Sequence, residues 1–390
     1  MNIKKCAFSA KSIAPVLSAL THEQKNHAIL SIAKSIQDNI SEIIAANNED
    51  LARSEKEQLA SPLLKRLKFD EAKISEAIEG LKSLVALSDP VGVTQYAIEL
   101  DEGLKLYRVS CPIGVIGVVF ESRPDALVQI SSLCLKSGNA VLLKGGKEAM
   151  ETNRILAKKI TAASKECGIP EGWMHLLETR DDVKEMLSMD AYIDLIIPRG
   201  SNEFVRYIMD NTRIPVLGHA DGICHLYVDE DADIEMAVSL ALDSKTQYVA
   251  VCNALETLLV HEKIAAKFLP NLKTAMDKKG VELIGCGRTQ MHIPVTPATE
   301  SDWSTEYLDY RLSIKVVDSL DEAIEHINTY GSGHTDAIVT ADESAAMKFM
   351  ERVDSANVFW NVSTRFSDGY RYGLGAEVGI STNKIHARGP

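Results

Sequence analysis

The sequence predicts an α/β protein that contains a doubly wound parallel sheet. Short aliphatic runs alternate with helical patterns over residues 113–211, and a second set of such elements begins near residue 245. A segment with alternating apolar and polar residues, at about 94–110, lies between the N-terminal region and the first of these runs. Alternating strands and helices are typical of βαβ units, which form parallel sheets.

The first 88 residues are expected to be mainly helical, because apolar residues recur at helical spacing over 29–44 and 74–85. Residues 89–92, Asp-Pro-Val-Gly, end this pattern. The next segment alternates around an Asp-Glu-Gly turn at 101–103, which predicts a hairpin over about 94–110. A hairpin outside the main sheet suggests an oligomerisation element.

The alternating region contains four predicted strands, each followed by a predicted helix. The helices are expected at 125–137, 147–167, 180–189 and 202–211. The strands are GVIGVVFE, NAVLLKGG, MHLLE and IDLIIPRG. A sheet of this kind typically binds a nucleotide at the carboxyl ends of its strands.

We place the main domain boundary near residue 245. The first domain, 1–245, would hold the N-terminal helices, the hairpin and the nucleotide-binding sheet. The second domain, 246–365, begins with the strand ALETLLVH. Residues 366–390, rich in Gly and polar residues, are expected to return to the first domain and the oligomerisation region.

Composition excludes several classes of protein. The 42 Lys and Arg residues against 55 Asp and Glu residues give a net charge of −13, which opposes binding to nucleic acid. No stretch reaches about 18 consecutive apolar residues, so we expect no membrane segment and a cytoplasmic protein. Seven cysteines without a C-x-x-C pair suggest neither a disulfide framework nor a zinc site, and no metal cluster has ligand spacing.

Two strand ends have small residues that lead into a helix. They are Lys144-Gly145-Gly146-Lys147 and Arg199-Gly200-Ser201-Asn202. Glycine lets a phosphate approach the backbone, and the N-terminus of a helix attracts an anion. These segments could contact a phosphate or a ribose, or they could be ordinary turns. The two lysines of the first turn favour an anionic ligand.

Cys252 lies at the predicted domain boundary, where a site between two domains would be expected. It could be a nucleophile or a small buried residue. His219 could be a general base or a buried polar group with a satisfied partner. Arg365 could bind an amino-acid-like substrate or cap its loop, and Arg123 lies in another loop expected near the cleft.

Seven segments carry a resemblance to a known family. The chain resembles the gamma-glutamyl phosphate reductases, a branch of the aldehyde dehydrogenase superfamily, over about residues 10–390. Two of the segments, ESRPDALVQI and LGHADGICH, are most similar to the reductase half of the pyrroline-5-carboxylate synthases. The segments are GVIGVVFESRPDALVQI, NAVLLKGGKEAMETN, IDLIIPRGSN, PVLGHADGICHLYVD, VCNALETLLVH, STRFSDG and GLGAEVGISTNKIHARGP.

The resemblance implies an aldehyde dehydrogenase-like fold, with an NADP-binding domain, a catalytic domain and an oligomerisation hairpin. It implies NADPH-dependent reduction of gamma-glutamyl phosphate to glutamate-5-semialdehyde and phosphate, the second step of proline biosynthesis. Cys252 matches the nucleophile of the family, which forms a thioester that a hydride then reduces. The resemblance also implies a homo-oligomer and a possible coupling to a glutamate kinase. The family usually continues past HARGP with a segment that pairs in the oligomer, whereas this sequence stops at Pro390, so the resemblance implies either a chain that is cut short or a different assembly.

The resemblance further assigns residues to the cofactor. Lys144 matches the lysine that reaches the adenosine ribose, with Gly146 in the same turn. Gly200 and Ser201 match the pyrophosphate turn, and Glu306 matches the glutamate that holds the nicotinamide ribose. Many relatives that use NAD carry a glutamate at the position of Lys147. A cation there suits a 2′-phosphate and favours NADP.

Two other functions are compatible with the same segments. One is an aldehyde dehydrogenase that oxidises its substrate and hydrolyses the thioester, and the other is a catalytically silent scaffold. Hydrolysis needs a base that activates water, and the superfamily supplies a glutamate for this purpose. No acidic residue occurs between Arg213 and Ala220, although His219 could partly substitute. The sequence therefore favours a reductase.

Overall fold

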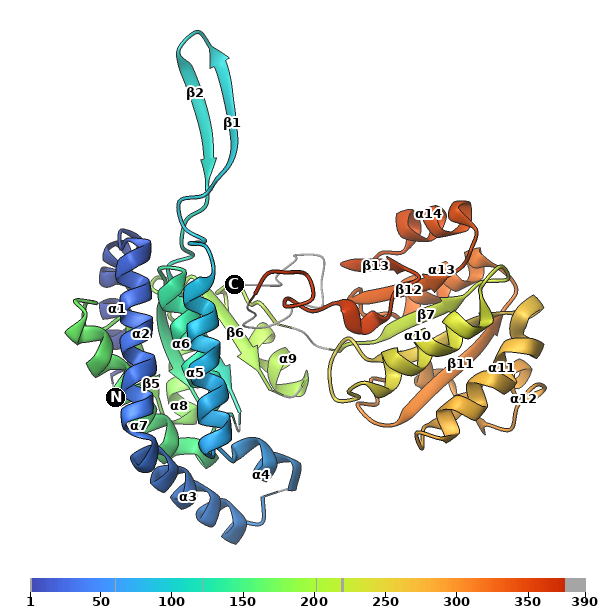
Figure 1. Cartoon of the computed structure of the whole chain (residues 1–390), viewed down its shortest axis with the longest axis horizontal. Coiled ribbons are helices and arrows are strands. Elements are labelled where there is room, and N and C mark those ends of the chain that lie inside the picture. The colour runs from blue at the N-terminus through green and yellow to red at the C-terminus, as the bar shows by residue number, and fades with distance from the viewer. Residues whose placement is uncertain (1, 60, 122, 201, 219–220, 376–390) are drawn as a thin grey trace. The chain divides into compact units, whose positions relative to one another are not determined.

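A computed structural model of the chain describes residues 2–375 except 60, 122, 201 and 219–220 (Figure 1). The described residues form two compact units. Unit 1 comprises the residues up to Gly218 together with Gly375, and unit 2 comprises residues 221–374. In the described part of the chain, every helix falls short of the length and apolar character that crossing a membrane requires.

Unit 1 contains a four-stranded parallel sheet with the order β5-β4-β3-β6. The order reverses at β3, as expected for a doubly wound sheet, so the prediction of this fold class is confirmed. Its strands are almost entirely apolar because helices cover both faces. They are β3 (Val115–Phe120), β4 (Ala140–Lys144), β5 (Met174–Leu177) and β6 (Leu195–Arg199).

Several helices of unit 1 begin at residues that favour the start of a helix. Thr21 forms a capping box with Gln24, Asp70 accepts from Lys73 N, and Pro124 occupies the first turn of its helix. The helices are α1 (Ile3–Ser18), α2 (His22–Asp38), α3 (Ile40–Lys56), α4 (Ser61–Leu67), α5 (Glu71–Ala86), α6 (Pro124–Lys136), α7 (Met150–Glu166), α8 (Arg180–Leu187) and α9 (Asn202–Asp210), with a 3₁₀ turn at Lys147–Ala149.

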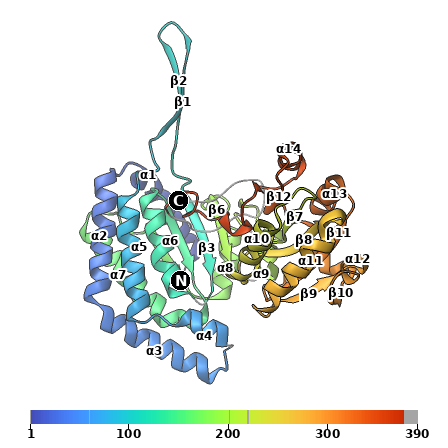
Figure 2. The same ribbon diagram turned by 45° about the vertical axis from the view of Figure 1, so that its right-hand side comes forward.

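The predicted hairpin is present as β1 (Thr94–Asp101) and β2 (Leu104–Val109), which pair antiparallel. Gly103 occupies the turn with φ of +76°, a conformation that favours glycine. Every residue of both strands is exposed, including apolar side chains such as Ile98 and Leu106. The ribbon extends away from the helices of unit 1 (Figures 1 and 2).

Unit 2 contains a seven-stranded parallel sheet with the order β10-β9-β11-β8-β7-β12-β13. The central strands are buried on both faces. The strands are β7 (Cys224–Val228), β8 (Leu255–His261), β9 (Glu282–Gly285), β10 (Thr296–Pro297), β11 (Arg311–Val317), β12 (Thr335–Val339) and β13 (Asn357–Trp360).

Helices pack on both faces of this sheet, and each face has its own cluster of buried apolar side chains. Leu226 and Leu258 face Phe268 in one cluster, whereas Tyr227 and Leu259 face α13 and α14 in the other. Neighbouring side chains along a strand point to opposite faces, which explains the division. The helices are α10 (Ile234–Thr246), α11 (Glu262–Asp277), α12 (Gly287–Gln290), α13 (Leu320–Tyr330) and α14 (Glu343–Arg352), with 3₁₀ turns η2 (Glu300–Ser304) and η3 (Thr364–Phe366).

The division between the units differs from the boundary expected near residue 245. Strand β7 pairs with β8 and β12, so it belongs to the second sheet, and α10 packs in the same unit. The change between units therefore falls near residue 218. The aliphatic run 223–228 has the same local pattern as the strands before it, and only its pairing assigns it to the second sheet.

The buried His326 on α13 predicts a dependence of stability on pH. Burial, with the charges of His225 and Lys315, lowers its pKa from 6.5 to about 3. The unfolded chain therefore binds a proton below pH 6.5 that the folded chain does not bind. Between pH 7 and pH 5 this group should lower the free energy of unfolding by about 2 kcal/mol.

The variant His326→Gln removes this titration, so wild type should lose more stability than the variant as the pH falls. Urea unfolding followed by tryptophan fluorescence at pH 7 and pH 5 measures the difference. An equal loss in both proteins would show that His326 is protonated in the folded state.

Candidate active site

Four loops of unit 2 meet at the amino edge of its sheet. Gly222 precedes β7, Cys252 precedes β8, Glu306 precedes β11 and His334 precedes β12. Strands β11, β8, β7 and β12 are parallel neighbours, so the residues that precede them lie along one edge. This edge gathers the candidate catalytic residues.

Cys252 and His334 are in contact. His334 Nε2 lies 3.2 Å from Cys252 Sγ, and the histidine is fully buried while the cysteine is partly exposed. A thiol beside an imidazole can transfer its proton and become a nucleophile. Sequence reasoning missed His334. Its only signal is its place in GSGHTDAIV, directly before a buried strand.

The backbone around Cys252 is held on two sides. A Cβ atom added to Gly222 would lie 2.1 Å from Cys252 O and 2.5 Å from its Cα, so only glycine fits there. On the other side, Asn253 Nδ2 donates to Ser367 O at 2.7 Å, and Thr364 Oγ1 donates to Asn253 O at 2.8 Å. These contacts fix the position of the thiol.

Glu306 is tied to the same cluster, because its Oε1 accepts a hydrogen bond from Gly222 N at 3.0 Å. The glycine that contacts Cys252 therefore also orients the carboxylate. The next part of the loop is anchored by Leu308 N, which donates to the buried Glu256 at 3.3 Å. Sequence reasoning named Glu306 but gave no reason for its proximity to the thiol.

Arg365, in η3, brings a positive charge toward Cys252. Burial lowers the pKa of its guanidinium, whereas the nearby Asp368 and Cys252 favour the charged form. Arg365 Nε is buried and has no hydrogen-bond partner within the described residues. A donor left open beside a thiol suits a bound anion.

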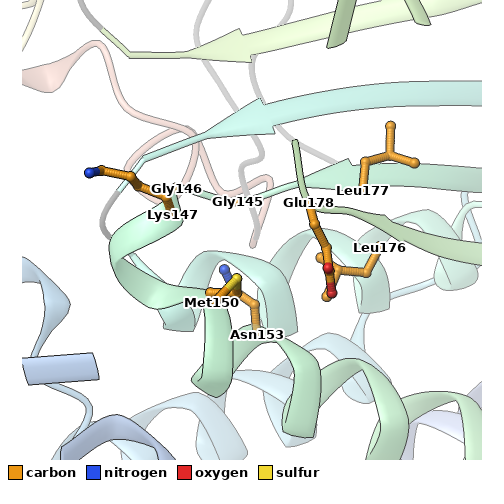
Figure 3. A pocket seen from close by; sticks show the side chains of 8 residues that line it. All are labelled: Gly145, Gly146, Lys147, Met150, Asn153, Leu176, Leu177 and Glu178. Carbon is orange, nitrogen blue, oxygen red and sulfur yellow. The ribbon is translucent and has the colours of Figure 1, made fainter. Parts of the chain in front are cut away.

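In unit 1, the turn after β4 borders a pocket. Figure 3 shows that its lining comes from this turn, from α7 and from the end of β5, and that the Lys147 side chain extends away from the others. A Cβ atom on Gly145 would lie 2.1 Å from Asn153 Nδ2. The lining residues are Gly145, Gly146, Lys147, Met150, Asn153, Leu176, Leu177 and Glu178.

The polar groups near this turn are consistent with a ligand. Asn153 is buried, and its Oδ1 lacks a hydrogen-bond partner among the described residues. Lys144 ends β4, and burial lowers its pKa while Glu148 opposes this effect. Arg53 donates to the carbonyls of Lys147 and Glu148 at 3.2 and 3.1 Å and thereby holds the turn.

Lys147 is exposed and forms an ion pair with Glu57, with Nζ 3.0 Å from Oε2. This partner comes from the loop after α3, and no local sequence pattern predicts it. At the end of β6, a Cβ atom on Gly200 would lie 3.1 Å from Phe204 Cδ1 and 3.3 Å from Glu121 Cδ. A side chain at this turn would therefore crowd its neighbours.

The remaining candidates are divided between the units. Arg123 precedes α6 in unit 1 and forms an ion pair with Asp125 at 2.8 Å. Ser201 and His219 lie outside the described residues. Within the described part of the chain, no group of three or more His, Cys, Asp and Glu side chains could hold a metal ion.

The doubly wound sheet of unit 1 and the thiol–histidine pair of unit 2 define an enzyme of the α/β class. The chain belongs to the aldehyde dehydrogenase family, whose model matches residues 2–299 and 312–375. It is 69% identical to the gamma-glutamyl phosphate reductase of Acetivibrio thermocellus, over 100% of this chain and 90% of that protein.

Two further proteins support this assignment. The gamma-glutamyl phosphate reductase of Pelotomaculum thermopropionicum is 70% identical, again over 100% of this chain and 90% of the relative. The crystal structure of the gamma-glutamyl phosphate reductase of Thermotoga maritima matches with a TM-score of 0.97 and a sequence identity of 42%. The match covers 100% of this chain and 95% of that chain. The family resemblance drawn from the sequence is confirmed, and the chain is an oxidoreductase.

The close contact at Gly222 predicts the effect of a single methyl group. In Gly222→Ala the new Cβ must displace the backbone of Cys252 and weaken the hydrogen bond to Glu306. We expect a loss of roughly 1–3 kcal/mol in the free energy of unfolding and a fall in turnover of at least about tenfold.

Gly287→Ala is the matched control, because a Cβ atom there meets nothing within 4 Å. Urea unfolding and steady-state rates of both variants measure the effect. If Gly222→Ala behaves like Gly287→Ala, the close approach of the backbones is not needed.

Proposed function

We propose that this enzyme reduces gamma-glutamyl phosphate to glutamate-5-semialdehyde and phosphate with NADPH, through a thioester on Cys252, as the second step of proline biosynthesis. The observation that carries the proposal is the thiol–histidine pair, with a separation of 3.2 Å. It occurs in a chain 69% identical to a gamma-glutamyl phosphate reductase.

The residues of unit 2 supply the chemistry on the acyl group. The Cys252 thiolate attacks the acyl carbon and phosphate leaves, which converts the acyl phosphate into a thioester. The open Nε donor of Arg365 would hold a substrate anion, a carboxylate or the phosphate. Arg123 and His219 remain further candidates for binding the substrate.

The residues of unit 1 fit a nicotinamide dinucleotide. Gly145 lets the turn pack closely against Asn153, since a Cβ atom would lie 2.1 Å from Asn153 Nδ2, and the buried Asn153 Oδ1 has an open acceptor site within the described residues. Lys144, Gly146, Gly200 and Ser201 would hold the adenosine and pyrophosphate, and Glu306 of unit 2 would hold the nicotinamide ribose. Bound NADPH would supply the hydride that reduces the thioester.

The sequence lacks the carboxylate that would activate water in an oxidising dehydrogenase, and this favours a reductase. No Asp or Glu occurs between Arg213 and Ala220, where the superfamily glutamate that activates water is expected. Water would then attack the thioester slowly, and the acyl group would remain for reduction.

We further propose that the β1–β2 hairpin joins copies of this chain. Its apolar side chains, such as Leu100, Leu104 and Leu106, are more than half exposed, at 59, 57 and 51%. An exposed apolar ribbon is stabilised when it pairs with another chain.

A glutamate kinase is the partner enzyme that would supply the labile acyl phosphate.

Cys252→Ser should abolish NADPH oxidation in the presence of gamma-glutamyl phosphate, because an alkoxide does not form at neutral pH where a thiolate does. Binding of NADPH should change little, because the nucleotide turns belong to unit 1. Absorbance of NADPH gives the rate, and fluorescence titration gives the dissociation constant.

The control for this variant is Cys286→Ser, which changes another partly exposed thiol of unit 2. It should keep its rate. Turnover of Cys252→Ser within tenfold of wild type would refute the thioester, and a wild-type enzyme that does not reduce the acyl phosphate would refute the proposed substrate.

Lys147→Glu should weaken the preference for NADPH over NADH, because a carboxylate repels a 2′-phosphate and accepts from a 2′-hydroxyl. One charge-assisted contact corresponds to about one to two orders of magnitude in the ratio of kcat/KM values. Glu57→Gln should act in the opposite direction, since it releases Lys147 from its ion pair.

The exposed Lys158 on α7 carries no such role, and Lys158→Glu tests the effect of charge alone. Measured kcat/KM values for both cofactors decide the question. If the ratio of kcat/KM for NADPH to that for NADH is unchanged in Lys147→Glu, Lys147 does not bind the 2′-phosphate.

A further inference from the structure

A chain of hydrogen bonds leads from the catalytic thiol to the C-terminal loop of unit 2. His334 Nδ1 lies 2.6 Å from Thr335 Oγ1, and Thr335 Oγ1 accepts from Asn357 Nδ2 at 3.3 Å. Tyr372 OH donates to Asn357 Oδ1 at 2.7 Å. His334 Nε2 in turn lies 3.2 Å from Cys252 Sγ. The four side chains therefore form one continuous chain of polar contacts that ends at the thiol.

We propose that His334 is the proton acceptor of the Cys252 thiol and that Thr335, Asn357 and Tyr372 position its ring for this transfer. The proposal rests on the proposed function for the identity of the acyl substrate, but the proton transfer itself needs only the described residues of unit 2. His334 is here a catalytic residue, and the other three are positioning residues.

The hydrogen bonds of Asn357 fix the orientation of its amide. Oδ1 can only accept, and it receives the Tyr372 hydroxyl. Nδ2 can only donate, and besides Thr335 Oγ1 it reaches His334 O at 3.0 Å. One amide therefore holds both the backbone of His334 and the hydroxyl that contacts its ring.

The Thr335 hydroxyl suits a histidine that changes its protonation state. For Nε2 to accept the thiol proton, the neutral ring must carry its own proton on Nδ1, and the Thr335 hydroxyl oxygen accepts from this N–H both before and after the transfer. Thr335 and His334 are both fully buried, which keeps bulk solvent away from this contact. A carboxylate in this place would hold the imidazolium much more strongly and would retard the return of the proton.

Of the charged groups that face the pair, Arg365 favours the transfer, whereas the carboxylate of Glu306 opposes it. Arg365 interacts with Cys252 from η3, and its positive charge stabilises a thiolate. Cys224 faces Cys252 from β7, where burial raises its pKa, so it stays a thiol and donates to Cys252 O at 3.2 Å. Glu306, from the loop before β11, is bonded to Gly222 N.

The proton transfer fits the complete reaction. The S–H bond breaks, an N–H bond forms at His334 Nε2, and the sulfur electron pair forms the C–S bond to the acyl carbon. The C–O bond to phosphate breaks, and phosphate leaves with that electron pair and takes a proton from water. After hydride from NADPH reduces the thioester, the C=O bond forms again, the C–S electrons return to sulfur, and the Nε2 proton returns to Cys252.

The test measures thiol reactivity in the absence of substrate and cofactor. Full-length protein is treated with iodoacetamide at pH 5 to 10, and alkylation of the Cys252 peptide is followed by mass spectrometry. In wild type, the midpoint of the rate profile should lie below the value of about 8.5 expected for a free thiol. A midpoint at or above that value would overturn the proposal without any variant.

His334→Gln keeps a polar side chain but cannot accept the proton. Its midpoint should rise, and its alkylation rate at pH 7 should fall by about tenfold or more. Thr335→Val and Tyr372→Phe should move the midpoint in the same direction by a smaller amount. A lost structural contact alone would lower the melting temperature without moving the midpoint.

His326→Gln is the matched control, since it replaces another buried histidine of unit 2 and should leave the profile of Cys252 unchanged. If His334→Gln does not fold, the profile of Thr335→Val decides, and a midpoint equal to that of wild type refutes the arrangement. A shifted midpoint in an enzyme that does not reduce gamma-glutamyl phosphate would refute the proposed substrate while the thiol–histidine pair stands.

Discussion

Four neighbouring strands of unit 2 run parallel, and the loops that enter them must therefore meet at one edge. The order β11-β8-β7-β12 aligns the residues that precede these strands, which supply the thiol, the imidazole, the carboxylate and the close-packed glycine of the site. Ligands in open parallel sheets commonly lie at the carboxyl ends of the strands. Here the sheet of unit 2 presents its amino edge, whereas the nucleotide turns of unit 1 follow the usual rule.

A buried ion pair supports this edge from within. Lys245 on α10 and Glu256 on β8 are both fully buried, with Nζ 2.7 Å from Oε2. Burial raises the pKa of Glu256 to about 7, and the charge of Lys245 opposes this effect. Since Glu256 also accepts from Leu308 N, the pair links α10 and β8 to the loop that carries Glu306. Removal of one partner would leave a buried charge alone, which is far more costly than the pair itself.

The position of the thiol and its reactivity depend on different contacts. Gly222 and the hydrogen bonds of Asn253 fix the backbone of Cys252, whereas His334 and Arg365 act on its side chain. The first group sets where the nucleophile lies, and the second sets its charge. This separation lets variants of the two groups be told apart by stability and by the pH profile of the thiol.

The sequence alone determined the doubly wound sheet, the hairpin, the turns after β4 and β6, and the family, because periodicity, glycine placement and motif content are local properties. Tertiary structure decided the rest. His334 is 82 residues from Cys252, and Lys147 is 90 residues from its partner Glu57. The run 223–228 resembles the strands before it, yet it pairs with β8 and β12. Such contacts depend on which strands pair and in what register. A parallel sheet joins segments that are distant in the sequence, and their local patterns do not indicate which of them pair.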